Sequence, residues 1–143
     1  MKAECDRESL LSACQLVSAA VASRDVKPIL KNFKAIADGD RCTLMATDLE
    51  VGMRFDLQNL LIEEPGEAIL PAARLVAILR EARDTRLSIE ASPTECVVRG
   101  ASLEFEMPGE DPAQFPDIPT FSDKQYHEFA AGAAWEFAAQ LYT

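Results

Sequence analysis

Hydrophobic positions change their spacing several times along the chain, and each change predicts an element. Residues 1–5 (MKAEC) alternate, which predicts a short strand with Ala3 and Cys5 on one side. Asp6 then provides an N-cap for a helix through about Val21. Four apolar residues recur at helical spacing on one stripe of that helix: Leu10, Cys14, Val17 and Val21. A loop is expected over residues 23–28 (SRDVKP), because the residue before a proline avoids helical geometry.

From Ile29 to about Ser92 the pattern becomes mainly that of strands. Strand-like runs at residues 29–37 and 42–47 flank Asp38-Gly39-Asp40, a strong hairpin signal. Residues 51–57 (VGMRFDL) follow with apolar side chains at every second position. An antiparallel meander is therefore expected after the first helix.

A second strand and helix interrupt this region. Residues 67–71 (EAILP) run into a helix whose first position suits Pro71, since the missing N–H has no partner there. The predicted buried stripe of this helix is Leu75, Ile78, Leu79 and Ala82. Arg74, Arg80 and Arg83 lie off the stripe. Three further strands are expected, at residues 86–92, 95–101 and 103–109.

The pattern of a strand running directly into a helix occurs at residues 1–17, 66–82 and 126–142. The first two copies are each followed by a meander, which indicates an internal duplication of α+β type. Residues 108–119 carry half of the eight prolines and form a connector. We therefore expect one complete duplicated domain followed by the beginning of a second.

Composition limits the possible functions. The chain has 143 residues, 48% hydrophobic and 27% charged, which suits one soluble domain and a fragment of another. No stretch approaches the ~18 apolar residues of a membrane span, and the four cysteines have no metal-ligand spacing, so reduced thiols in a cytoplasmic protein are expected. The net charge of −10 argues against a generally adhesive nucleic-acid binder, although only a local patch has to meet phosphates.

One short stretch raises the question of carboxylate chemistry. Asp48 and Glu50 lie one residue apart, and with Asp56 they could hold a divalent metal in an enzyme. Alternatively, Thr47, Asp48 and Glu50 form a turn in which Thr or Asp side chains accept backbone hydrogen bonds, and this structural interpretation is favoured. The single histidine, His127, is interpreted as a strand-surface residue, and no catalytic residue or cofactor site is predicted.

Basic residues are sparse, and two interpretations of them remain open. Arg24 and Lys27 lie in one loop, whereas Arg74 and Arg80 lie on one helix. Each is either an ordinary solvated charge or part of one locally positive surface, formed if the two strand-helix units lie side by side.

Three segments carry a family resemblance: residues 26–57 (VKPILKNFKAIADGDRCTLMATDLEVGMRFDL), 67–81 (EAILPAARLVAILRE) and 105–119 (FEMPGEDPAQFPDIP). Together they resemble the first domain of the bacterial sliding clamp, the beta subunit of DNA polymerase III. The resemblance implies an N-terminal clamp domain over residues 1–119 and the beginning of the central domain over residues 120–143. It implies the DNA-clamp fold, with two helices packed inside antiparallel sheets.

In this family three such domains form a subunit, and two subunits close head to tail into a ring around duplex DNA, with the helices lining the hole. The role implied is processivity for DNA polymerase III, not catalysis. The resemblance places the polymerase and clamp-loader contacts in domains that this sequence does not include. Two alternatives are a divalent-metal enzyme and a clamp-like protein-binding module that never meets DNA.

The resemblance also implies roles for single residues. Arg24 matches a DNA-contact position, and Lys27, Arg74 and Arg80 are expected to contact DNA with it. The family's second basic contact is expected at position 73, which is alanine here, and Arg74 is the nearest guanidinium. The subunit interface is expected to include five residues: Phe105, Met107, Leu103, Ile78 and Arg74. Glu104 and Glu106 flank Phe105 where better-known members have basic residues.

Overall fold

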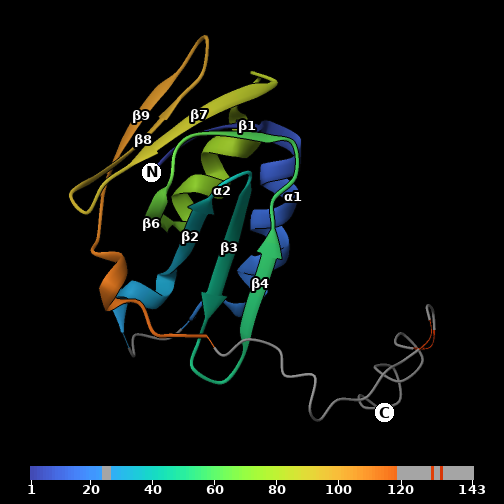
Figure 1. Cartoon of the computed structure of the whole chain (residues 1–143), viewed down its shortest axis with the longest axis vertical. Coiled ribbons are helices and arrows are strands. Elements are labelled where there is room, and N and C mark those ends of the chain that lie inside the picture. Colours follow the sequence, from blue (N-terminus) through green and yellow to red (C-terminus); the bar gives the residue numbers. More distant parts are fainter. Residues whose placement is uncertain (24–26, 119–129, 131–132, 134–143) are drawn as a thin grey trace.

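The computed structural model describes residues 1–23, 27–118, 130 and 133, and within them it has two helices and two antiparallel sheets (Figure 1). This arrangement confirms the predicted α+β class. In chain order the elements are β1 (Lys2–Asp6), α1 (Arg7–Val17), β2 (Asn32–Asp38), β3 (Arg41–Thr47), β4 (Gly52–Asp56), β5 (Leu60–Glu64), β6 (Gly66–Pro71), α2 (Ala72–Glu81), β7 (Arg86–Ala91), β8 (Glu95–Arg99) and β9 (Glu104–Pro108).

The two halves of the described chain exchange their opening strands. One sheet has the order β5-β1-β7-β8-β9 and the other has the order β4-β3-β2-β6. The first strand of each half therefore pairs with the meander of the other half, β1 with β7 and β6 with β2. Each meander follows a strand-helix unit, so the duplicated pattern in the sequence corresponds to a duplicated unit in the fold.

The first helix begins as predicted and ends earlier. Asp6 is its N-cap, and the carboxylate accepts a hydrogen bond from the backbone N–H of Ser9 at 2.9 Å. The α-helix ends at Val17, where a 3-10 turn (Ser18–Ala20) begins, and Val21 is already extended. The hydroxyl of Ser18 donates to the carbonyl of Cys14 at 2.6 Å, which favours this tightened end over further helix.

Three local expectations needed correction. Residues 28–31 form a 3-10 helix (Pro28–Lys31), so the strand predicted from Ile29 begins only at Asn32. Pro71 ends β6 and is the N-cap of α2 instead of its first residue. Strand β5 was not predicted, because its alternation is short and its second half is acidic.

The core lies between the helices and the sheets. The largest fully buried side chains include Phe33, Leu44, Leu75 and Leu79. A smaller cluster lies where the connector, with its 3-10 turn (Pro112–Gln114), brings Phe115 against Ile69 of β6.

All four cysteines are free and buried, as the sequence indicated: Cys5, Cys14, Cys42 and Cys96. Burial raises the pKa of the Cys5 and Cys14 thiols to about 12, so they stay protonated at neutral pH. No helix of the described residues is long and apolar enough to cross a membrane.

We expect Phe33→Ala to lower the free energy of unfolding by about 3–5 kcal/mol, because the ring is fully buried and its removal leaves a cavity. Phe105→Ala is the matched control, because it removes the same ring from a residue that is 46% exposed. Urea unfolding followed by circular dichroism measures both. Equal losses in the two variants would contradict the assignment of Phe33 to the core.

Candidate functional site

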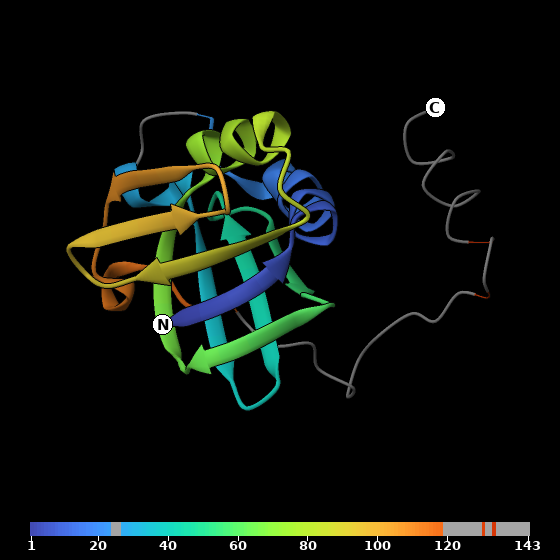
Figure 2. The same cartoon turned by 90° about the horizontal axis from the view of Figure 1, so that it is seen from above.

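The two helices lie side by side along one side of the sheets (Figure 2). One contact between them joins their opposite ends: the guanidinium of Arg7, at the start of α1, donates to the carbonyl of Leu79 at 3.1 Å and to that of Asp84 at 3.0 Å. A cation at the carbonyl end of a helix is electrostatically favourable. Arg7 therefore fixes α1 against α2. Nothing in the local sequence pattern indicated this role.

The outward face of the helix pair is small, polar and lightly charged. From α1 and the turn after it, the exposed residues away from the core include Ser12, Gln15, Leu16 and Ala19. From α2 they are Ala73, Arg74, Ala77, Arg80 and Glu81. We call the face formed by these nine residues the helical face. Four of the nine side chains are short (Ser12, Ala19, Ala73 and Ala77), and two arginines against one glutamate leave the face a charge of +1 (2 − 1).

Additional positive charge lies beside the first turn of α2. Lys31 and Arg74 line one hollow of about 280 Å³, which Glu110 of the connector also lines. Lys31 is the last residue of the 3-10 helix (Pro28–Lys31) that precedes β2. No side chain caps the N-terminus of α2, so its first N–H groups add to the local positive potential.

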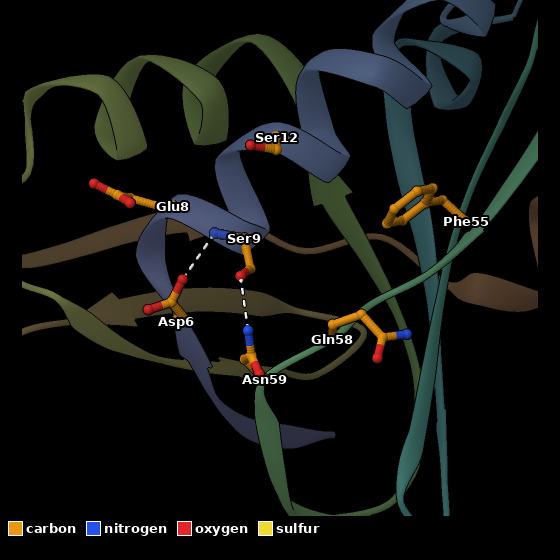
Figure 3. A pocket seen from close by; sticks show the side chains of 7 residues that line it. All are labelled: Asp6, Glu8, Ser9, Ser12, Phe55, Gln58 and Asn59. Carbon is orange, nitrogen blue, oxygen red and sulfur yellow. Dashed lines mark hydrogen bonds between the residues drawn. The ribbon is translucent and has the colours of Figure 1, made fainter.

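A second hollow, of about 490 Å³, lies at the start of α1 and has the opposite charge (Figure 3). Asp6 and Glu8 line it, and the Asp6 carboxylate already accepts the hydrogen bond from Ser9. The amide of Asn59 donates to the Ser9 hydroxyl at 3.3 Å, which ties the β4–β5 connection to the helix. The carboxylates make this end of the helix pair unfavourable for phosphates.

The Thr47–Val51 turn is held by its own side chains. One Asp48 carboxylate oxygen accepts the backbone N–H groups of Glu50 at 2.9 Å and of Val51 at 2.8 Å. The Thr47 hydroxyl accepts from Leu49 N–H at 3.1 Å and donates to the Val51 carbonyl at 2.8 Å. These bonds support the left-handed conformation of Leu49, at φ 76°. The bonds from Val51 and Glu50 lower the pKa of Asp48 from its ordinary value of 3.8.

Geometry contradicts the metal site built on Asp48, Glu50 and Asp56. Asp56 pairs with Thr43 at one end of the β3–β4 ladder, whereas Gly52 pairs with Thr47 at the turn. Four residues of strand separate the two ends by about 13 Å, and oxygens of one hard-cation site lie ~2.0–2.6 Å from the ion. Asp56 instead accepts a hydrogen bond from the Thr43 hydroxyl at 2.7 Å.

Comparison with known protein families matches residues 1–119 to the family described as DNA polymerase III beta subunit, N-terminal domain. The chain belongs to this family. A beta sliding clamp of Caulobacter vibrioides is 32% identical over 119 residues, which cover 81% of this chain and 32% of that protein. The beta sliding clamp of Pseudomonas putida is 30% identical over 113 residues, or 78% of this chain and 31% of that protein.

The chain thus spans about a third of the length of the curated relatives it matches. Solved structures show the same fold. A DNA polymerase sliding clamp from Bacillus subtilis superimposes with a TM-score of 0.82 at 24% identity, over 87% of this chain and 35% of that one. A DNA polymerase III beta subunit from Eubacterium rectale superimposes with a TM-score of 0.81 at 28% identity, over 87% and 34%.

The predicted DNA-contact residues that the structure describes lie on α2 and just before the 3-10 helix (Pro28–Lys31). Arg74 and Arg80 are both exposed on α2, and Lys27 is exposed immediately before the 3-10 helix. Arg24 lies outside the described residues, and so do His127 and most of residues 120–143. Lys31, which lines the hollow beside Arg74, was not among the predicted residues, because the run containing it was interpreted as a strand.

The predicted interface residues separate into exposed and buried ones. Phe105 is exposed on β9, whereas only 5% of Met107 and 9% of Ile78 are exposed, both within the main core. Leu103 is half-buried against the same core. Met107 pairs with buried Cys96 across the β8–β9 ladder, so it points inward. Of the five predicted interface residues, Phe105 and Arg74 are therefore the exposed ones.

We expect Asp48→Ala to destabilise the domain at neutral pH, because two backbone N–H groups lose their acceptor. A lowered pKa means that the folded state prefers the carboxylate. Its contribution is therefore fully present above pH 3.8 and is lost as the pH falls through the folded-state pKa. Urea midpoints of the wild type and Asp48→Ala should differ at pH 7 and converge at low pH.

Glu50→Ala is the control for this measurement, and its midpoint should stay close to the wild type, because Glu50 is exposed. A difference between wild type and Asp48→Ala that persists unchanged at low pH would contradict the carboxylate mechanism. Stabilisation by Mg²⁺ that disappears in Asp48→Ala would restore the metal hypothesis.

Proposed function

We propose that this domain is part of a replicative sliding clamp and that its helical face is directed toward duplex DNA inside a ring. The observation that carries the proposal is the pairing of α1 and α2, which exposes a weakly positive face, with two arginines and one glutamate, on an acidic chain. Membership in the beta-subunit family supports it.

The charge distribution suits a protein that slides. Direct contacts to individual phosphates would have to break and re-form at each step along DNA, whereas a diffuse positive potential permits sliding. Arg74, Arg80, Lys27 and Lys31 provide a weak local positive potential, while the chain as a whole carries −10. The remaining acidic surface favours solubility and limits adhesion elsewhere.

The division of the chain is part of the proposal. We assign residues 1–119 to the N-terminal clamp domain and residues 120–143 to the beginning of the central one. The family match over residues 1–119 supports the first of these ranges. Arg24 joins the proposed DNA-contact set through its match to a DNA-contact position of the family. The clamp has no catalytic role of its own and acts in the cytoplasm.

Partners follow from the same proposal. A second clamp subunit meets the β9 edge and α2, through Phe105 and Arg74, and closes the ring. DNA polymerase III and the clamp loader bind elsewhere on the complete clamp. A clamp-like module that binds only proteins is the competing proposal, and DNA binding by the helical face separates the two.

We expect Arg74→Ala and Arg80→Ala each to weaken binding of a labelled 20-base-pair duplex at low ionic strength. Each lost phosphate contact should reduce the slope of log affinity against log salt by about 1. Fluorescence anisotropy across a salt series measures this slope.

Arg41→Ala is the matched control, since Arg41 begins β3 beside the turn that lies far from the helices in Figure 2. It removes the same charge and should leave the slope unchanged. Equal effects of all three variants would mean that net charge alone governs binding. Unchanged affinity in both α2 variants would favour the protein-binding module.

A further inference from the structure

The β9 strand forms an open edge with an unusual set of side chains. It is the last strand of the five-stranded sheet, and no strand of the described chain pairs with its outer side. Glu104, Phe105 and Glu106 follow one another there, all exposed, and 46% of Phe105 is accessible. An open strand edge with a large exposed aromatic residue is a docking surface for another strand.

The ladder determines which backbone groups are available. Gly100 N–H donates to the Leu103 carbonyl at 2.9 Å, and Gly109 N–H donates to the Thr94 carbonyl at 3.1 Å. From these two bonds it follows that the backbone groups of the odd-numbered residues of β9 are hydrogen-bonded to β8. The N–H and C=O groups of Glu104 and Glu106 therefore point away from β8, toward the open edge. Pro108 ends the edge because it has no N–H.

Register divides the β9 side chains between the two faces of the sheet. Phe105 lies opposite Val98, which is fully buried, so the ring is on the core-facing side. Glu104 and Glu106 lie on the outer face, opposite Arg99 and Val97 respectively. A strand added beside β9 extends the sheet, so its side chains also alternate between the two faces. Its residues beside Glu104 and Glu106 lie on the outer face, and the residue between those two lies beside Phe105.

Negative charge exceeds positive charge on the outer face here. The guanidinium of Arg99 is shared, since it bonds Glu104 and Glu90 at 3.0 Å each. Glu106 faces outward beside Val97, which brings it no charge. An incoming strand with acidic residues at these positions would place like charges directly opposite one another, which destabilises sheet pairing.

We propose that the β9 edge binds an extended strand with the pattern basic–apolar–basic, in which Lys or Arg side chains pair with Glu104 and Glu106 and the apolar residue packs on Phe105. This proposal rests on the proposed function for the contact between subunits. It adds the chemistry of the partner strand at the β9 edge.

The occupant is not a second copy of this sequence. Among its 14 Lys and Arg residues, no two are separated by a single residue, so the chain contains no basic–x–basic segment. We therefore assign the complement to another domain of the partner clamp subunit, whose contact with the β9 edge is part of the proposed function.

Two short peptides test the proposal, Ac-Thr-Lys-Val-Lys-Thr-NH2 and its Glu-Val-Glu counterpart. Titrated into the isotope-labelled chain and followed by NMR, the basic peptide should bind about tenfold more tightly and shift the amides of Glu104 and Glu106. In the Glu104→Lys/Glu106→Lys variant the preference should reverse. Phe105→Ala should weaken both peptides without changing which one is preferred.

Glu63→Lys/Glu64→Lys is the matched control, because it makes the same charge change on β5, at the opposite edge of the same sheet. It should leave the preference intact. Equal binding of both peptides, shifts away from β9, or no binding of the basic peptide would overturn the proposal. A preserved peptide preference together with a failed duplex titration would reject the DNA role while retaining β9 as a strand-recognition edge.

Discussion

The exchange of opening strands between the two halves is the constraint on which the rest of the structure depends. Because β1 pairs with β7 and β6 pairs with β2, neither half completes its sheet alone. Each opening strand runs directly into a helix, so the same exchange brings α1 and α2 side by side. The contact of Arg7 with α2 then fixes the pair, and one core serves both halves.

This arrangement separates the surfaces of the domain. The helical face is weakly positive, which suits a duplex that must pass without being held. The open β9 edge carries backbone groups that can add a strand, and we propose that its acids make that addition selective. In the proposed clamp, specificity for a protein partner and tolerance of any DNA sequence thus occupy different parts of one fold.

Periodicity predicted much of the fold because local rules govern it: the Asp6 cap, the hairpin at Gly39 and the buried stripe of α2 all follow from short segments. It did not predict the Arg7 contact, which joins residues more than 70 positions apart. The 3-10 helix before β2 was missed because Leu30 is fully buried and its run is as apolar as a strand. The sequence favoured a turn for Asp48 and Glu50, and the structure has a turn there. That Asp56 lies too far away to share a metal with them follows only from the register of the β3–β4 ladder.

The central claim is that this domain belongs to a ring held on DNA by topology more than by affinity. The most direct measurement is retention of a complete clamp containing this domain, loaded on nicked circular DNA, before and after a single cut. The account predicts that the clamp stays on the circle at elevated salt and leaves once the DNA is linear. Equal dissociation from circular and linear DNA, at a rate set by salt alone, would contradict it.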